Sequence, residues 1–288
     1  MNDPALSTDP ADPRRSPLHA RHEALGAQFT DFGGWLMPLR YGSDLAEHHA
    51  VRQAAGLFDI SHMAELHVSG PDAAAFLDAA VTADATAIAV GRARYAMLLE
   101  PDGGIVDDLI VYRLGDAHFL VVANAGNRAP VVEALEARAA GFEVRVHDAT
   151  ETTALVAVQG PQAERILRAL PGLNAEDSEP AEALAALRYY AATRMSFDGF
   201  PLLVARTGYT GEDGFELFVP VPGAAALWDA LLAAGAPFGI VPAGLAARDT
   251  LRLEAGMPLY GHELSRDILP AQAGLGRVGP PTKTADFV

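Results

Sequence analysis

The chain has 288 residues, of which 50% are hydrophobic and 20% charged, and its 21 basic and 37 acidic residues give a net charge of −16. This acidic balance argues against binding to nucleic-acid phosphates or to an anionic membrane surface, since both need clustered Lys and Arg. The chain contains no cysteine, which excludes disulfides, thiolate metal sites, iron–sulfur clusters and a Cys nucleophile. The length suggests about two domains. No apolar run reaches the roughly 18–20 residues of a membrane span, so we expect no spanning segment.

The first residues, 1–16, are rich in Pro, Asp and Ser. They lack the apolar core of a signal peptide. We interpret them as a disordered leader on a cytoplasmic protein.

An internal repeat organises the middle of the chain. Leu66–Leu77 and Val156–Leu167 each read as a strand, a Gly-Pro turn and the opening of a helix. His118–Leu135 and Gly214–Leu232 form a second matching pair at a similar offset. The pattern predicts two tandem β-α-β-β-α-type units.

The strand pattern predicts the fold class. Tyr95–Leu99 and Ile105–Tyr112, separated by Pro-Asp-Gly-Gly, are typical of an antiparallel hairpin. The class is therefore α+β, with antiparallel sheets covered by helices. A nucleotide-binding parallel fold requires a Gly-x-Gly-x-x-Gly motif after its first strand, and none is present there. Near the end, Gly274–Val278 reads as a further strand.

The most informative stretch is 102–112, a Gly-rich turn followed by an apolar strand. Strict alternation puts Asp108 on one strand face with Val106, Ile110 and Tyr112. An unpaired carboxylate among apolar side chains is costly, so Asp108 has either a structural partner or a ligand. The alternative is that Asp107 and Asp108 cap the turn and one of them points to solvent.

Two further segments carry polar side chains suited to a ligand. In the Gly-rich loop 206–216, Tyr209 can stack on a flat ring and Glu216 can accept hydrogen bonds from ring N–H groups. The alternative is a hairpin connection with a buried tyrosine. In the amphipathic helix 243–257, Arg248 can meet a carboxylate or carbonyl, unless the helix charges only pair with one another.

Other polar and aromatic residues leave the choice open. His62 is the best-placed histidine for function, although a lone loop histidine is usually structural. Tyr189, Tyr190 and Trp35 can equally be core aromatics. No His-Glu-x-x-His motif occurs, and we expect no metal site.

Taken together, these segments resemble the T-protein family of the glycine cleavage system, the tetrahydrofolate-dependent aminomethyltransferases. The resemblance runs in order from about Ser16 to Val278, and eight motifs together are far more specific than any one. The matching segments are Phe32–Leu39, Glu47–Arg52, Gly56–Met63, Gly103–Tyr112, Val122–Arg128, Gln159–Pro161, Arg206–Glu216, and Pro242–Glu254 with Tyr260–Glu263.

The resemblance implies two ferredoxin-like units with antiparallel sheets around a folate cavity. We expect residues 17–268 to form this region, with repeat-like halves at about 58–147 and 148–262. The family also carries a C-terminal β-barrel domain, of which residues 269–288 would be only the start. We therefore expect a C-terminally truncated chain, with folding, affinity and turnover affected.

The activity implied is transfer of the aminomethyl carbon from the dihydrolipoyl arm of H-protein to tetrahydrofolate, with release of ammonia and formation of 5,10-methylenetetrahydrofolate. Tetrahydrofolate is a co-substrate and no metal is required. The partner implied is lipoylated H-protein, with no nucleic acid and no membrane. Asp108 fits the catalytic carboxylate, and Asp107 would face the other side of the strand. By motif position the folate site would comprise Met63, Tyr95, Tyr112, Val122, Asn124, Tyr189, Tyr209, Glu216 and Arg248.

Three alternatives remain. The folate-binding proteins of iron–sulfur maturation carry a Cys in a motif that here reads Met257-Pro-Leu-Tyr-Gly-His-Glu263. The folate domain of sarcosine- and dimethylglycine-oxidising flavoproteins is fused to a flavin module, which is not found here. The third is a non-catalytic folate-binding or H-protein-binding module, inactive through loss of the C-terminal domain.

Overall fold

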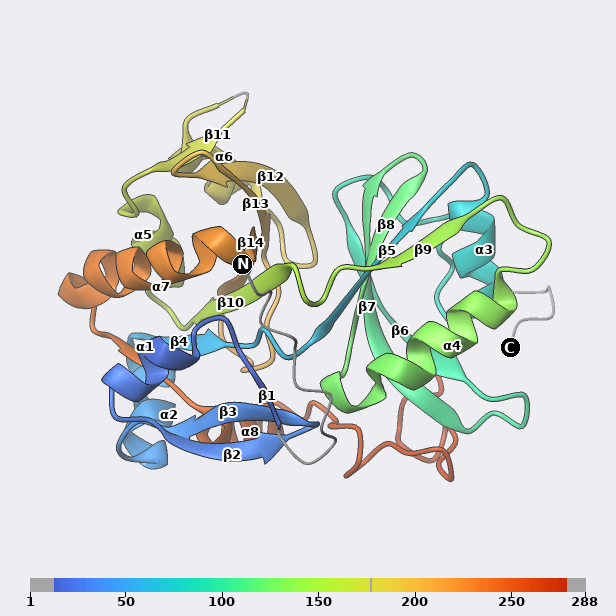
Figure 1. Cartoon of the computed structure of the whole chain (residues 1–288), viewed down its shortest axis with the longest axis horizontal. Helices are drawn as coiled ribbons and strands as arrows, with labels where there is room; N and C mark the ends of the chain where they lie inside the picture. The colour runs from blue at the N-terminus through green and yellow to red at the C-terminus, as the bar shows by residue number, and fades with distance from the viewer. Residues whose placement is uncertain (1–12, 177, 279–288) are drawn as a thin grey trace, which may run out of the picture.

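The computed structural model describes residues 13–176 and 178–278, which form three sheets with helices packed on them (Figure 1). The two larger sheets lie next to each other and are joined by the strands that pass between them (Figure 1). Nearly all strand pairs are antiparallel. The predicted α+β class with antiparallel sheets is confirmed.

The first unit is a five-stranded antiparallel sheet in the order β6-β7-β8-β5-β9. Its strands are β5 (Ala64–Ser69), β6 (Ala93–Leu99), β7 (Ile105–Gly115), β8 (His118–Ala123) and β9 (Arg145–Asp148). Helices α3 (Ala73–Ala80) and α4 (Arg128–Arg138), with the short η1 (Ala125–Asn127), cover its outer face (Figure 1). Phe76, Leu77, Phe119 and Val131 pack between the helices and the sheet. The strand–turn–helix unit predicted for Leu66–Leu77 and the hairpin predicted across Pro-Asp-Gly-Gly are both confirmed.

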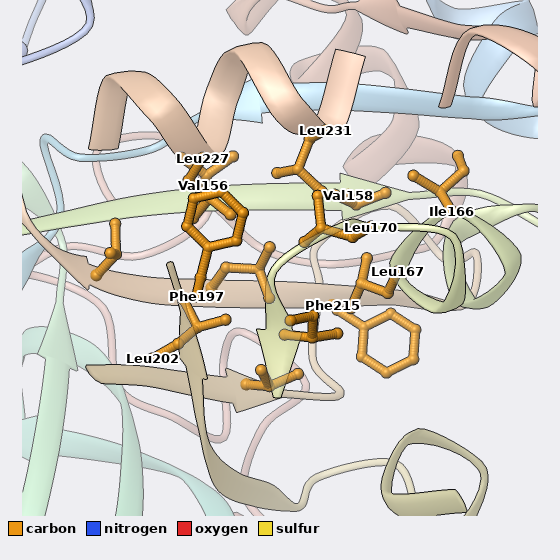
Figure 2. Packing of buried hydrophobic residues seen from close by; sticks show 14 of the residues in the cluster. Val156, Val158, Ile166, Leu167, Leu170, Phe197, Leu202, Phe215, Leu227 and Leu231 are labelled. Atoms are coloured by element: carbon orange, nitrogen blue, oxygen red, sulfur yellow. The ribbon is translucent and has the colours of Figure 1, made fainter. Parts of the chain in front are cut away.

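The second unit is a seven-stranded sheet in the order β11-β12-β13-β14-β10-β4-β15. Its strands are β4 (Ala55–Asp59), β10 (Thr153–Gln159), β11 (Leu173–Ala175), β12 (Ala192–Phe197), β13 (Phe200–Ala205), β14 (Gly214–Pro220) and β15 (Ile240–Pro242). Helices α5 (Ala163–Arg168), α6 (Pro180–Ala186) and α7 (Val221–Gly235), with η2 (Ala236–Phe238), lie on one face. Figure 2 shows the resulting core, where Leu227 and Leu231 of α7 lie over Val156, Val158 and Phe197 of the sheet.

One strand does not follow chain order. β4 precedes the whole first unit in sequence, yet it pairs with β10 and β15 of the second sheet. The predicted boundary at about residue 58 therefore falls inside β4, a strand that belongs to the second sheet and not to the first. Because β4 leads directly into β5, the turn between them connects the two sheets.

Helix α7 bears on the expectation that no segment could span a membrane. With η2 it forms an 18-residue segment, Val221–Phe238, that is apolar and long enough to do so by length and composition alone. That expectation was wrong on the length criterion. In the structure Leu227, Trp228 and Leu231 are fully buried in the core of the second unit, which accounts for the apolar sequence.

A third, smaller sheet in the order β1-β3-β2 lies below the second unit in the view of Figure 1. It consists of β1 (Arg14–Arg15), β2 (Gln28–Phe32) and β3 (Trp35–Arg40). Helices α1 (His19–Ala24), α2 (Asp44–Gln53) and α8 (Leu245–Glu254) accompany it, and α8 contacts both β3 and α2.

Two expectations about the chain ends do not hold. The predicted disordered leader fails at its last residues, because β1 pairs with β3 and the buried Ser16 donates a hydrogen bond to Asp59. Residues 1–12 lie outside the described residues. The strand predicted at Gly274–Val278 is instead a run of turns: Gly274 has φ +74°, and Val278 N donates to Leu275 O at 3.0 Å. Residues 279–288 are likewise outside the description.

Candidate functional site

A cavity of about 300 Å³ opens between the two large sheets and is closed on one side by α8 and the segment after it. That volume is at the lower end of the roughly 300–1,000 Å³ usual for small-molecule sites. Residues from both sheets and from the connecting turn line it, so the folded halves share one site. The lining residues are Phe32, Ile60, His62, Met63, Tyr95, Asp108, Leu109, Ile110, Val122, Asn124, Leu155, Tyr190, Gly208, Tyr209, Glu216, Arg248, Gly256, Met257, Pro258, Leu259 and Leu275.

Asp108 on β7 is the carboxylate of the first sheet that reaches this cavity. Its Oδ2 accepts from the hydroxyl of Tyr95 on the neighbouring strand at 3.0 Å, and its Oδ1 accepts from Asn124 Nδ2 at 2.7 Å. Burial raises the pKa of Asp108, while these two hydrogen bonds act in the opposite direction. The side chain is thus oriented by two donors and remains open to a ligand on the cavity side.

One of the three residues predicted to share a strand face with Asp108 lies on the other face. The β6–β7 ladder shifts register, because Leu98 pairs with Asp107 whereas Leu99 pairs with Ile105. This bulge turns Val106 into the helix-covered core of the first unit, so Val106 does not share a face with Asp108. The alternation holds beyond the bulge, where Ile110 and Tyr112 pack in the core between the two sheets.

Asp107 is fully buried beside the site and is not a lining residue. It accepts hydrogen bonds from the backbone N of Asn124 at 2.9 Å, from Asn124 Nδ2 at 2.9 Å and from Asn127 Nδ2 at 2.6 Å. Burial and the charge of Asp108 raise its pKa to about 7, against those hydrogen bonds. The alternative that the two aspartates merely cap the turn is wrong, since Asp102 Oδ1 accepts the turn N–H of Gly104. Asp107 instead fixes the loop that carries Asn124.

Glu216 on β14 provides the corresponding carboxylate of the second sheet. Its Oε2 accepts from Thr207 Oγ1 at 2.5 Å and from the hydroxyl of Tyr112 at 3.3 Å. Among the described residues, Glu216 Oε1 has no hydrogen-bond partner. Since the residue lines the cavity, that oxygen is an acceptor available to a ligand N–H.

The Gly-rich loop supplies Tyr209 to the opposite wall. The guanidinium of Arg248 lies 4.6 Å from the centre of the Tyr209 ring, a cation–π contact, and the Tyr209 hydroxyl donates to Pro258 O. A Cβ on Gly208 or Gly214 would lie 2.0 Å or 2.4 Å from side-chain atoms of Gln159, so these glycines make room for that residue, and Gly208 also lines the cavity.

The two central arginines of α8 have different surroundings, because Arg252 forms ion pairs and Arg248 faces the cavity. Arg252 pairs with Asp249 at 2.8 Å and with Glu263 at 2.7 Å, as the alternative of helix salt bridges requires. Arg248 faces the cavity, and within the described part of the chain its guanidinium has no ion pair or hydrogen bond. Burial lowers its pKa, while the Tyr209 and Glu216 charges oppose that shift. It is a cation available to a ligand.

Eight of the ten site residues predicted from sequence line the one cavity, and two do not. Those in the lining are Met63, Tyr95, Asp108, Val122, Asn124, Tyr209, Glu216 and Arg248. Tyr112 lies behind the wall, fully buried and bonded to Glu216. Tyr189 is 55% exposed, and its neighbour Tyr190 lines the cavity instead.

Tyr190, His62 and Phe32 also line the cavity, although they are not among the ten predicted site residues; of the three, only His62 stood out in the sequence as a functional candidate. Tyr190 adopts φ +57°, a left-handed conformation rarely tolerated by a bulky side chain. Its backbone is held on both sides, because its N–H donates to Arg206 O and its carbonyl accepts from Ala93 N. A strained residue fixed between two sheets is typical of functional sites, but that strain is not readable from a Tyr-Tyr pair.

No group of three or more His, Asp or Glu side chains within residues 13–176 and 178–278 is arranged to hold a metal ion. The polar groups of the cavity are instead two carboxylates, one guanidinium, one imidazole, one amide and three tyrosine hydroxyls, set among apolar side chains. This chemistry suits a flat organic ligand with several N–H donors.

Comparison with known proteins relates the chain to one family. Residues 18–281 match the family described as GCVT N-terminal domain. An aminomethyltransferase of Cutibacterium acnes is 57% identical over 277 residues, covering 96% of this chain and 74% of the relative. One of Streptomyces avermitilis is 55% identical over 276 residues, covering 96% and 72%.

A solved structure is also similar. The glycine cleavage system aminomethyltransferase T from Bartonella henselae superposes with a TM-score of 0.85 at 41% identity, covering 95% of this chain and 72% of that one. The chain thus corresponds to a little under three quarters of the length of the proteins it resembles.

Proposed function

The chain belongs to the glycine cleavage T-protein family of tetrahydrofolate-dependent aminomethyltransferases, and we propose that it moves the aminomethyl carbon from dihydrolipoyl H-protein to tetrahydrofolate. Ammonia is released and 5,10-methylenetetrahydrofolate is formed. The lipoylated H-protein is the partner, and the reaction takes place in the cytoplasm without a metal.

The observation that carries this proposal is the convergence of Asp108 and Glu216 on one cavity from two different sheets. A reduced pterin presents N–H donors and a flat ring, and the free Oε1 of Glu216 is matched to the donors. Tyr190 and Tyr209 offer aromatic faces for the rings, while Met63 adapts to irregular apolar surface. Fit between these groups and a folate therefore supports the assignment of the co-substrate.

In this mechanism Asp108 is the catalytic carboxylate. Transfer places positive charge on the aminomethyl carbon and on the nitrogen that attacks it. A fixed anion close to that charge lowers the barrier, because its orientation is set before the reaction begins. Tyr95 and Asn124 are the groups that fix it, through hydrogen bonds of 3.0 Å and 2.7 Å.

Arg248 would meet the lipoyl arm or the polar groups of folate, and Val122 on β8 and Asn124 just after it would complete the folate wall. Tyr112 contributes without touching the ligand, because its hydroxyl holds Glu216 in place. Residues 17–268 would form the folate-binding region, as their shared cavity suggests.

The test is a pair of measurements on the purified chain. Calorimetry with tetrahydrofolate reports binding, and an assay of ammonia released from aminomethyl-loaded H-protein reports transfer. Binding together with release supports the proposal. Binding with no release selects the non-catalytic folate-binding module, and absence of binding contradicts both.

A further inference from the structure

The turn between β4 and β5 carries His62, which lines the cavity but has no role in the reaction described above. His62 is 1% exposed and lines the cavity with Asp108 and Arg248. Its Nδ1 is buried, and neither of its ring nitrogens has a hydrogen-bond partner among the described residues. A buried polar side chain without a partner is unusual, and because His62 lines the cavity, its imidazole is available to a ligand group.

The position of His62 is fixed by the turn and not by bonds of the imidazole itself. Asp59, at the end of β4, accepts from the backbone N of Ser61 at 2.9 Å and bonds His22 Nε2 at 2.8 Å. The Ser61 hydroxyl donates to Leu155 O and accepts from Leu155 N, which joins the turn to β10. Asp59 and His22 are buried together. The turn is therefore held rigidly while the imidazole of His62 stays unbonded.

The surroundings of His62 keep it uncharged at neutral pH. Burial and the positive charge of Arg248 on α8 lower its pKa to about 3, and the charge of Asp59 opposes them. The ring of Phe32 meets it edge-on with the ring centres 5.3 Å apart. A neutral imidazole has one free lone pair that can take a proton, and because the pKa of His62 is lowered, the imidazolium formed is a strong acid that passes the proton on at once.

The other polar groups of the cavity have other roles in the proposed reaction. Asp108 is the fixed anion beside the developing positive charge, the free Oε1 of Glu216 accepts from a ring N–H of the ligand, and the Tyr209 hydroxyl donates to a backbone carbonyl. Arg248 can only donate. Burial raises the pKa of Tyr190, which makes its hydroxyl a donor and not a base.

We propose that His62 is a proton-transferring residue of the aminomethyl transfer, an inference that rests on the proposed function. Two folate nitrogens each form a bond to the transferred carbon and each lose a proton. The bonds from that carbon to the amine nitrogen and to the sulfur break, and one proton goes to each to give ammonia and the thiol. The free ring nitrogen of His62 takes one of the protons from folate and passes it to the departing amine. The imidazole ends the cycle neutral, so atoms and charge balance.

The experiment compares His62→Gln with the wild-type chain and with His49→Gln, a matched change of an exposed histidine on α2. Ammonia release from aminomethyl-loaded H-protein gives kcat, and calorimetry gives the Kd for tetrahydrofolate. General acid–base catalysis contributes about 10²- to 10⁴-fold, so we expect His62→Gln to lower kcat by about 10²-fold or more. We expect the Kd for tetrahydrofolate to change by less than about threefold, because the proposed role of His62 is to move protons and not to anchor folate. His49→Gln should match wild type in both.

Chemical rescue separates proton transfer from a packing role. In His62→Ala, added imidazole can enter the space that the ring leaves, and we expect it to restore part of the lost kcat; it should not help His62→Gln, whose side chain fills that space. Unchanged kcat in His62→Gln, or a Kd that weakens as much as kcat/KM, would overturn the inference. If the variants fail to fold, single-turnover transfer by wild type in H₂O and D₂O decides, and no isotope effect would contradict the role. Wild type that releases no ammonia would overturn the proposed function as well, whereas active wild type with unimpaired His62→Gln overturns only this inference.

Discussion

Replacing Asp108 by Asn removes one negative charge from the cavity and changes little else. The side-chain carbonyl of Asn can still accept from Asn124 Nδ2, which now lies 2.7 Å from Asp108 Oδ1. Its amide can donate to the hydroxyl oxygen of Tyr95, which now donates to Oδ2. Both hydrogen bonds can therefore be kept, with the direction of the one to Tyr95 reversed. For this reason we expect the free energy of unfolding to change by no more than about 1 kcal/mol.

The expected loss of turnover follows from electrostatics. A unit charge about 4 Å from the developing positive charge contributes roughly 4 kcal/mol at an effective dielectric constant of about 20. Each 1.4 kcal/mol or so is tenfold in rate, so Asp108→Asn should lower kcat by about 10²- to 10³-fold. The assay is ammonia release from aminomethyl-loaded H-protein at saturating tetrahydrofolate.

Two neighbouring aspartates are matched controls. Asp102→Asn changes an exposed turn residue and should leave kcat and stability close to wild type. Asp107→Asn changes a fully buried carboxylate that accepts three hydrogen bonds, so it should cost about 1–3 kcal/mol of stability and lower kcat less than Asp108→Asn does. If Asp107→Asn lowered kcat more than Asp108→Asn while both variants remained folded, the assignment of the catalytic carboxylate would be refuted.

Three further predictions concern binding and stability. Glu216→Gln should weaken tetrahydrofolate binding roughly tenfold in calorimetry, since a hydrogen bond to a charged acceptor contributes about 1.5 kcal/mol or more. Tyr190→Ala should weaken the same binding while Tyr189→Ala should not, and equal effects would contradict the placement of Tyr190 alone in the cavity wall. The pKa of Asp59 is lowered, because hydrogen bonds and charge from His22 outweigh burial. Its contribution to stability is therefore present above its unfolded pKa of about 4 and lost as pH falls below that, so urea unfolding of Asp59→Asn should show a flatter acid limb than wild type.

Much of the architecture could be predicted because it depends on local patterns. The Gly-Pro turns, the two strand–helix echoes and the Pro-Asp-Gly-Gly hairpin are set by short-range chemistry, and each appears where the spacing predicts it. The position of β4 could not be predicted in this way. Its pairing with β10 and β15 depends on contacts between segments far apart in sequence, which no periodicity encodes.

At the site, the sequence predicted residue types well and geometry less well. Asp108 and Glu216 stand out as carboxylates in apolar strands, and both reach the cavity. The bulge beside Val106 is invisible to a strict alternation, because one extra residue reverses the face of everything before it. Tyr189 and Tyr190 are chemically identical in sequence, and only the backbone conformation at Tyr190 decides which of the two turns inward.

The seam between the sheets explains why residues behind the cavity wall still matter to it. Tyr112 belongs to β7 of the first unit, and its hydroxyl reaches Thr207 at 3.0 Å and Glu216 at 3.3 Å in the second unit. A shift of one sheet against the other would therefore move Glu216 relative to Asp108, four residues before Tyr112 on the same strand. The two carboxylates are held at a set separation by a hydrogen bond that no ligand touches. A cavity shared by two units needs such a link, because neither unit alone fixes both of its ends.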